Sequence, residues 1–208
     1  MKKISESTIR RLSKYYRSLE QLVDNDVETV SSDQLAEMDG ITSAQVRKDL
    51  SFFGTFGKRG LGYSTRKLKK QIGDILGLSK EWRVAIVGAG NIGRALAKFV
   101  EFKKQGFNIH LIMDSDPVKV GEQVEDLQVE DTGNMETLLK EKEIEIAIVA
   151  VPTFAAQRVA DELIAAGIQA ILNFAPIHLK APEGIKIKNA NTVIQIEALS
   201  YFLTNPPE

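Results

Sequence analysis

The chain has 208 residues, of which 43% are hydrophobic and 26% charged. Its net charge of −1 is unevenly distributed: residues 1–80 carry +5 (15 Lys and Arg, 10 Asp and Glu) and residues 81–208 carry −6. This length fits one domain of about 100–150 residues with a smaller one, and the basic N-terminal part favours a polyanionic partner. The chain has no cysteine, so no disulfide or thiolate metal site is expected. It shows neither an apolar signal core nor a run of ~20 apolar residues, so no membrane partner is expected and a cytoplasmic location is.

Three helices are predicted at the N-terminal end. Residues 7–24 carry apolar side chains at the helical period. Two capping-box patterns follow, Ser31 with Gln34 and Thr42 with Gln45, and each can open a helix through reciprocal side-chain to backbone hydrogen bonds. Two short helices joined by a glycine-containing turn form a helix-turn-helix.

The helices opened by these boxes are expected at about 32–38 and 43–53. In the second, Val46, Leu50 and Phe53 recur at i, i+4 and i+7 and should face the core. The opposite face then carries small, hydroxyl and cationic side chains, which suits a helix that enters the major groove of DNA. An ordinary solvated helix face is the alternative.

A glycine-rich stretch from Phe53 to Tyr63 holds four glycines around Lys58 and Arg59. It predicts a β-hairpin wing with two cations at its tip, where an arginine can enter a narrow minor groove; a flexible surface loop is the alternative. The candidate DNA-binding residues of the N-terminal domain are Arg10, Arg11, Ser43, Ala44, Gln45, Arg47, Lys48, Ser51, Lys58, Arg59 and Tyr63.

The middle of the chain carries a dinucleotide-binding fingerprint. A buried strand at 82–87 precedes the turn Gly88-Ala-Gly-Asn-Ile-Gly93 and a helix from about 91 to 104. Gly88 permits the tight turn, Gly90 lets the backbone approach a pyrophosphate, and Gly93 allows the helix to pack on the strand.

A second strand at 108–113 ends in Asp114, about 20 residues beyond the last glycine, where an acid can accept the ribose hydroxyls. Asp114-Ser115-Asp116 offers two carboxylates and no cation, which favours NAD or NADH over a 2′-phosphorylated cofactor. The candidate cofactor-binding residues are Gly88, Ala89, Gly90, Asn91, Ile92, Gly93, Asp114, Ser115, Val151, Pro152, Asn173, Ala175 and Pro176.

Helices and strands continue to alternate to the C-terminal end. Helices are expected at about 134–142 and 154–166, and strands at 144–151 and 169–173, which predicts an α/β fold with a doubly wound parallel sheet. The apolar segment 191–204 needs a partner surface, either its own domain or a second subunit. The predicted organisation is a winged-helix domain at 1–78, a Rossmann domain at 79–190 and a dimerisation helix and tail at 191–208.

Catalysis is not expected. A dehydrogenase needs a proton donor or acceptor beside the nicotinamide, and the chain has only His110, inside a predicted strand, and His178, with no carboxylate partner close in sequence. No second catalytic domain is expected after the nucleotide fold. An NAD-dependent dehydrogenase and an NAD-binding oligomeric scaffold remain the alternatives to a regulator that binds the nucleotide as a signal.

The chain resembles the Rex family of redox-sensing transcriptional repressors nearly end to end. The resemblance is carried by the segments Ser43–Ser51, Phe56–Tyr63, Gly88–Ala97, Asp114–Pro117, Asn173–Pro176 and Leu199–Tyr201. It implies a homodimer with winged-helix domains on an inverted-repeat operator and a Rossmann domain that binds NAD or NADH. It also implies a C-terminal helix exchanged between subunits, and release from DNA by NADH.

Two departures from the family pattern concern the switch. The resemblance implies a sensing role for an arginine, here Arg17, together with a tyrosine in the first Rossmann helix and an acidic residue before the C-terminal helix. This chain has Phe99 and Asn191 at those two positions. The loss of a phenol and a carboxylate removes hydrogen-bond and ion-pair partners, so a weaker or altered response to NADH is expected.

Overall fold

The computed structural model describes residues 4–54, 56, 57 and 61–205. It divides into two compact units, residues 1–80 and 81–208, called here the N-terminal and C-terminal units. The boundary lies two residues from the expected one. The C-terminal helix belongs to the second unit.

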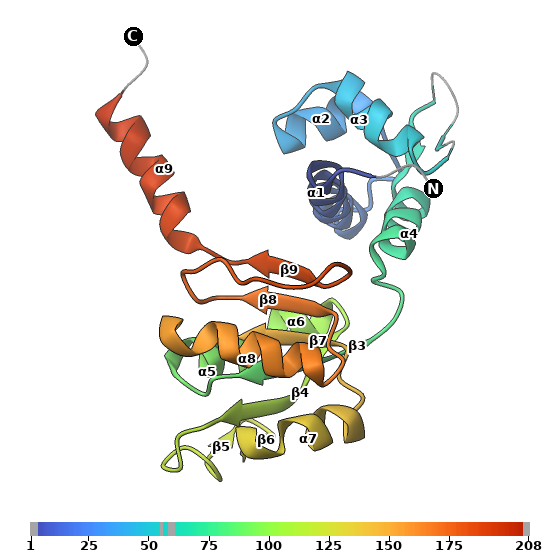
Figure 1. The fold of residues 1–208 in the computed structure, drawn as a ribbon. Coiled ribbons are helices and arrows are strands. Elements are labelled where there is room, and N and C mark those ends of the chain that lie inside the picture. Colours follow the sequence, from blue (N-terminus) through green and yellow to red (C-terminus); the bar gives the residue numbers. More distant parts are fainter. Residues whose placement is uncertain (1–3, 55, 58–60, 206–208) are drawn as a thin grey trace. The chain divides into compact units, whose positions relative to one another are not determined.

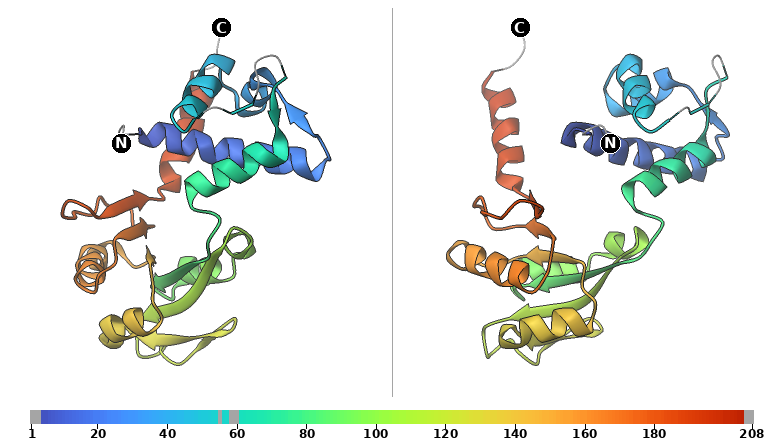
Figure 2. Two further views of the ribbon diagram at one scale, coloured as in Figure 1. Left: turned by 90° about the vertical axis from the view of Figure 1, so that its right-hand side faces the viewer. Right: turned by 45° about the vertical axis from the view of Figure 1, so that its right-hand side comes forward.

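The described residues of the N-terminal unit form helices and one short strand pair. Its elements are α1 (Glu6–Asp24), β1 (Thr29–Val30), α2 (Ser32–Asp39), α3 (Ser43–Ser51), β2 (Tyr63–Ser64) and α4 (Thr65–Leu76). Helices α1 and α4 lie side by side (Figure 2). Their apolar faces and those of α2 and α3 meet in one core that contains Leu12, Leu19, Val46, Leu50 and Leu68.

The helix-turn-helix is formed as the sequence predicts. Ser31 and Gln34 make the full capping box at α2, which ends at Gly40 in the left-handed region with φ 65°. The second box is only half formed and that expectation was wrong. Thr42 accepts from the backbone of Gln45, but the Gln45 side chain donates to the buried Asp49 instead of returning to the cap.

The predicted wing differs from a simple hairpin. The strand after its tip, β2, pairs antiparallel with β1 near residue 29, far back in the sequence. Before the tip, Phe53 and Phe56 pack on the core but lie in no strand, because Gly54 (φ 127°) and Gly57 (φ 74°) leave the extended region. Helix α3 ends at Ser51, two residues earlier than expected.

The C-terminal unit has a seven-stranded sheet in the order β5-β6-β4-β3-β7-β8-β9 (Figure 1). Neighbouring strands are parallel except β5 and β6. From β6 to β9 this is the doubly wound order that binds dinucleotides where the winding reverses, here between β3 and β7. The strands are β3 (Trp82–Val87), β4 (Phe107–Asp114), β5 (Gln123–Val124), β6 (Leu127–Asp131), β7 (Ile146–Val149), β8 (Ala170–Asn173) and β9 (Lys186–Asn189).

Helices cover both faces of the sheet. The helices of this unit are α5 (Asn91–Ala97), α6 (Val100–Lys104), η1 (Thr132–Asn134), α7 (Met135–Glu141), α8 (Thr153–Ala165) and α9 (Thr192–Thr204), and of these α9 does not pack on the sheet. Helices α7 and α8 pack on the face that carries Val87 and Met113, and α5 and α6 on the face that carries Ile86 and Ile112 (Figure 1). This alternation along the buried strands produces two cores, one on each side.

The first Rossmann helix is broken, contrary to the continuous helix expected over 91–104. Phe99 adopts an extended conformation (φ −77°, ψ 98°) between α5 and α6, and its ring packs edge-on against Phe102. In an unbroken helix Ala97 and Phe102 would point about 140° apart. The break lets both pack on the sheet.

Helix α9 leads away from the β9 edge of the sheet, and none of its residues is buried (Figure 1). Its large apolar side chains are 54–85% exposed. Within the described ranges, none of the helices has the length and apolar character to cross a membrane.

Candidate functional site

The glycine turn after β3 is shaped by two close backbone approaches. Gly88 has φ 108°, and a Cβ there would lie 2.4 Å from the Ala150 carbonyl oxygen. A Cβ on Gly93 would lie 1.8 Å from the carbonyl oxygen of Gly88. At Gly90, which caps α5, a Cβ would meet no protein atom within 4 Å. The fold therefore requires Gly88 and Gly93, whereas Gly90 leaves open space above the turn.

Asp114 stands at the end of β4 and is only 8% exposed. Its Oδ2 accepts hydrogen bonds from the backbone of Ala89 (2.8 Å) and from Lys119 Nζ (3.2 Å), and its Oδ1 accepts from the backbone of Asp116 (2.9 Å). Burial alone would raise the pKa of Asp114, but these hydrogen bonds outweigh it and lower the pKa. The carboxylate is ionised and held rigidly beside the glycine turn.

Lys119 corrects the expectation that no cation lies near the two carboxylates. Its ammonium group is 3.2 Å from Asp114 and 3.5 Å from Asp116. The turn that begins at Asp116 brings it there, since the backbone N–H groups of Lys119 and Val120 both donate to the Asp116 carbonyl. Two carboxylates against one ammonium leave this cluster net negative.

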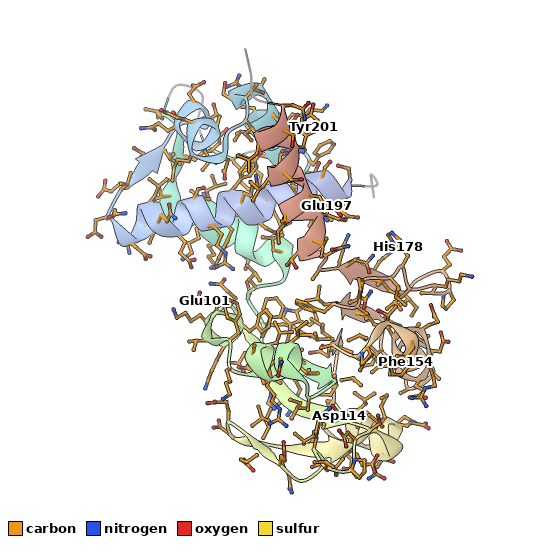
Figure 3. All side chains as sticks on the ribbon, turned by 90° about the vertical axis from the view of Figure 1, so that its left-hand side faces the viewer. Glu101, Asp114, Phe154, His178, Glu197 and Tyr201 are labelled. Atoms are coloured by element: carbon orange, nitrogen blue, oxygen red, sulfur yellow. The ribbon has the colours of Figure 1, made fainter. Side chains whose placement is uncertain are left out.

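A cleft of about 1050 Å³ opens over the glycine turn, at the carboxyl ends of the central strands. Asp114 and Phe154, which is 90% exposed, both line it (Figure 3). The expected cofactor-binding residues that line it are Gly88, Gly90, Asn91, Ile92, Asp114, Ser115, Val151 and Pro152. Lining residues that the sequence reasoning missed include Lys119, Thr132, Gly133, Met135, Glu136, Phe154, Arg158 and Glu162.

Lys119 comes from the turn after β4, and the other missed residues come from η1, from the start of α7 and from α8. Their only signal in the sequence was their position after strands whose carboxyl ends meet at the cleft. Strand β6 is too polar to be recognised as one of them.

Five expected residues do not line the cleft: Ala89, Gly93, Asn173, Ala175 and Pro176. Asn173 is fully buried, and its amide donates to the carbonyls of Ala175 and Ile177 and to Asn189 Oδ1, at 2.9–3.0 Å. It also accepts from the backbone of Ala175. In this unit the side chain of Asn173 therefore closes the loop after β8 and ties it to β9.

Neither histidine is set up as a proton-transfer group. His110 lies at an irregularity in β4, where Ile109 and Leu111 pair with consecutive residues of β3. Burial, with Arg83 and Lys142 nearby, lowers the pKa of His110. His178 has Asn189 as its neighbour, 3.5 Å from Nδ1.

Helix α3 separates into the two predicted faces. Val46 and Leu50 are buried, while Ala44, Lys48 and Ser51 are exposed. The remaining candidates of this unit differ in exposure. Arg10, Arg47 and Ser51 are exposed, Ser43 and Tyr63 are half-buried, and Lys58 and Arg59 lie outside the described residues.

Three candidate DNA contacts form hydrogen bonds within the protein. Arg11 forms a bidentate ion pair with the buried Asp49, at 2.5 Å from Nε and 2.8 Å from the terminal nitrogen. Gln45 donates to the same carboxylate at 2.8 Å. A terminal nitrogen of Arg47 donates to Ser32 Oγ on α2 at 2.8 Å.

Known proteins match this chain over nearly its full length. Residues 3–51 match a family model described as a putative DNA-binding protein N-terminus, and residues 79–177 match a CoA-binding-domain model. A redox-sensing transcriptional repressor Rex of Chloroflexus aggregans is 45% identical over 94% of this chain and 92% of its own length. The Rex repressor of Clostridium beijerinckii is 44% identical over 97% and 96%. The chain belongs to the Rex family of redox-sensing transcriptional repressors.

Solved structures of a Rex-family repressor, RSP, share the fold. RSP with β-NAD⁺ and operator DNA matches with a TM-score of 0.93 and 40% identity, over 98% of this chain and 94% of RSP. RSP with β-NADH matches with a TM-score of 0.90 and 39% identity, over 98% and 96%. Membership in a family of repressors confirms the expectation that the chain is a regulator and not a dehydrogenase.

The three residues expected to shape the Rex switch have local partners. Arg17, on α1, pairs with Glu20 at 3.1 Å and lies 5.8 Å above the Tyr16 ring. Phe99 is half exposed at the break between α5 and α6. The side-chain oxygen of Asn191 accepts from the backbone of Val193 and caps α9. An amide therefore serves as the helix cap at the position where the resemblance implies an acid.

Proposed function

We propose that this Rex-family chain is a homodimeric DNA-binding repressor whose affinity for an inverted-repeat operator is lowered by NADH. One observation carries the proposal: a helix-turn-helix with a cationic outer face and a dinucleotide cleft with a fixed carboxylate occur in one chain. The complexes of the relative RSP with NAD⁺ and operator DNA, and with NADH, support it.

NAD⁺ or NADH fits the cleft of the C-terminal unit. The open backbone at Gly90 suits the pyrophosphate, and Asp114 suits the adenine ribose, because an ionised carboxylate accepts from hydroxyl donors. Val151 and Pro152, on the far side of the turn, suit the nicotinamide half. The two carboxylates disfavour a 2′-phosphate even with Lys119 present, because the cluster stays negative. Reduction of the nicotinamide removes its positive charge, which supplies the signal.

The outer face of α3 suits the major groove. Lys48 is exposed between Ala44 and Ser51, and a lysine at this place can reach guanine O6 and N7. Arg10, Arg47 and Tyr63 are proposed as flanking contacts, and Lys58 and Arg59 as cations of the wing. Because the DNA of bacterial cells lies in the cytoplasm, the proposed location is cytoplasmic.

Dimerisation through α9 explains its exposed apolar surface. Seven large apolar side chains on a 13-residue helix are exposed, which is uncommon for a helix that stays in water. We place this helix against the partner subunit, exchanged as the Rex resemblance implies. Two operator half-sites related by symmetry then match two N-terminal units.

The response to NADH is proposed to be weaker than in Rex proteins with a tyrosine and an acid at the positions of Phe99 and Asn191. A ligand shifts a two-state dimer only by its differential affinity, and 100-fold discrimination requires about 2.7 kcal/mol per site. A charged hydrogen bond contributes about 1.5–3 kcal/mol. Phe99 offers no such bond, and the oxygen of Asn191 is used by the helix cap.

Replacing Lys48 with alanine should lower affinity for the operator by about tenfold, because a good base contact contributes about 1–3 kcal/mol of discrimination. Affinity for NADH should be unchanged. Fluorescence anisotropy with operator and scrambled duplexes measures both the loss and the discrimination. Lys70→Ala, an exposed lysine on α4, is the matched control. Unchanged operator discrimination in Lys48→Ala would place the DNA contact elsewhere.

A further inference from the structure

A fully buried carboxylate lies inside the helix proposed to face DNA. Asp49, on α3, is 0% exposed. Its Oδ2 accepts from Arg11 Nε at 2.5 Å and from the Tyr15 hydroxyl at 2.8 Å. Its Oδ1 accepts from a terminal nitrogen of Arg11 and from Gln45 Nε2, both at 2.8 Å, and more weakly from Thr8 Oγ1 at 3.5 Å. Both oxygens are saturated by protein donors.

The surroundings of Asp49 favour its ionised form. Burial would raise the pKa of Asp49, but the hydrogen bonds from Arg11, Tyr15 and Gln45 outweigh it and lower the pKa. Burial and the hydrogen bond to Asp49 raise the pKa of Tyr15, so its hydroxyl stays protonated and donates to Asp49. The bidentate guanidinium and the two further donors hold the buried carboxylate in one orientation. Any other orientation would break hydrogen bonds to a charge that water does not reach.

Three of the donors come from one face of α1. Thr8, Arg11 and Tyr15 are spaced at i, i+3 and i+7, the spacing of neighbours along a helix surface. The carboxylate thus joins α3 to α1 at a single point. Lys48 precedes Asp49 directly and lies about 100° away around the helix axis. Fixing Asp49 therefore fixes the direction in which Lys48 points.

We propose that Asp49, Arg11 and Tyr15 are positioning residues for operator recognition, which set the rotation of α3 against α1. Arg11 and Gln45 then act on DNA through Asp49 and not by contact, which revises their expected role. The inference rests on the proposed function of α3 as the DNA-facing helix. The proposed role concerns discrimination between DNA sequences and not electrostatic attraction to the DNA phosphates.

Salt dependence separates a positioning arginine from a phosphate contact. Each neutralised phosphate contributes about −0.9 to the slope of log affinity against log salt. Arg11→Gln should lower operator affinity at least tenfold, leave this slope unchanged and lower affinity for a scrambled duplex less than threefold. The matched control is Arg10→Gln, one residue earlier, whose side chain is 74% exposed beside Glu6. It should reduce the slope by about one unit per contact and leave discrimination unchanged.

A milder pair of variants keeps the test independent of folding. Tyr15→Phe removes one hydrogen bond from Asp49 and keeps the buried ring, and Tyr16→Phe is the matched change on the neighbouring, half-buried tyrosine. Tyr15→Phe should lower the ratio of operator to scrambled-duplex affinity three- to tenfold. Tyr16→Phe should not change it. NADH affinity in the C-terminal unit should be that of the unsubstituted protein in all four variants.

The outcomes separate this inference from the proposed function. If the unsubstituted protein binds operator no better than a scrambled duplex, the proposed function fails and the inference with it. If it discriminates, a slope reduced by one unit in Arg11→Gln shows a phosphate contact and overturns the inference alone. Unchanged discrimination in Tyr15→Phe also overturns it. So does unfolding of the N-terminal unit by Tyr15→Phe, since Tyr15 would then act on stability.

Discussion

Replacing Asp114 with alanine should weaken binding of both NAD⁺ and NADH by at least about 100-fold. Two hydrogen bonds from ribose hydroxyls to an ionised carboxylate contribute about 1.5 kcal/mol each at the low end, and about 1.4 kcal/mol corresponds to a factor of ten. The substitution also removes the acceptor of the Ala89 backbone N–H and the nearer of the two carboxylates that pair with Lys119. Isothermal titration calorimetry measures the loss directly.

Asp116→Ala is the matched control for this change. Its carboxylate also lines the cleft and pairs with Lys119 at 3.5 Å, but its removal leaves the three hydrogen bonds to Asp114 in place. It should cost less than about fivefold in affinity, as expected for an exposed ion pair. Calorimetry that gives Asp114→Ala the affinity of the unsubstituted protein would refute the ribose assignment.

Acid should not reproduce the effect of Asp114→Ala near neutral pH. The hydrogen bonds lower the pKa of Asp114 below its ordinary value, so the carboxylate stays charged as the pH falls from 8 to 5. Affinity that depends on this charge is lost only below that range, as protons reach the folded-state pKa.

Introducing a charge into α9 should dissociate the dimer. Leu199→Asp places a carboxylate among side chains that are 54–85% exposed in a single chain and that we propose to be buried between subunits. The loss of a leucine costs about 1.5–3 kcal/mol of burial, and an unpaired buried charge costs more. A dimer dissociation constant at least about 100-fold higher is expected. Operator affinity should fall with it, because one N-terminal unit reaches one half-site.

The oligomeric state is measured by analytical ultracentrifugation over a range of concentrations. Gln195→Asp adds the same charge to the same helix at a position that is already polar, and it should dissociate the dimer much less. A Leu199→Asp protein that sediments as a dimer would show that α9 does not hold the subunits together. A protein that is monomeric without any substitution would remove the dimer from the account.

The backbone of the cleft was predictable because its glycines have steric causes. Gly88 and Gly93 stand where a Cβ would collide with carbonyl oxygens, so the turn itself imposes their spacing. Asp114 follows a strand at a fixed distance from that turn. Lys119 and Phe154 could not be predicted, since they reach the cleft through a turn and a helix start that carry no recurring pattern.

The helix-turn-helix was predictable as a fold but not in its polar contacts. The helical period placed Val46 and Leu50 in the core correctly. The same reasoning put Arg11 and Gln45 on the surface, because a pairing across 38 residues, from Arg11 to Asp49, has no signature in one sequence. Buried ion pairs are formed by tertiary packing, which periodicity does not describe.

Strands β5, β6 and β9 were missed for a physical reason. Strand β9 lies at the sheet edge and exposes Lys186 and Lys188, charges that protect an edge from further pairing. Such a strand lacks the apolar run that marks a buried one. The break at Phe99 was missed because the sequence there contains no proline or glycine, and packing on the sheet decides it.

The most direct test of the central claim is fluorescence anisotropy of a labelled inverted-repeat operator with the purified protein. NADH is titrated against a fixed background of NAD⁺. Anisotropy should fall as NADH displaces NAD⁺ and the protein leaves the DNA. The midpoint should lie at a higher NADH to NAD⁺ ratio than for a Rex protein with tyrosine and acid at positions 99 and 191. Tight operator binding that is indifferent to NADH would contradict the central claim.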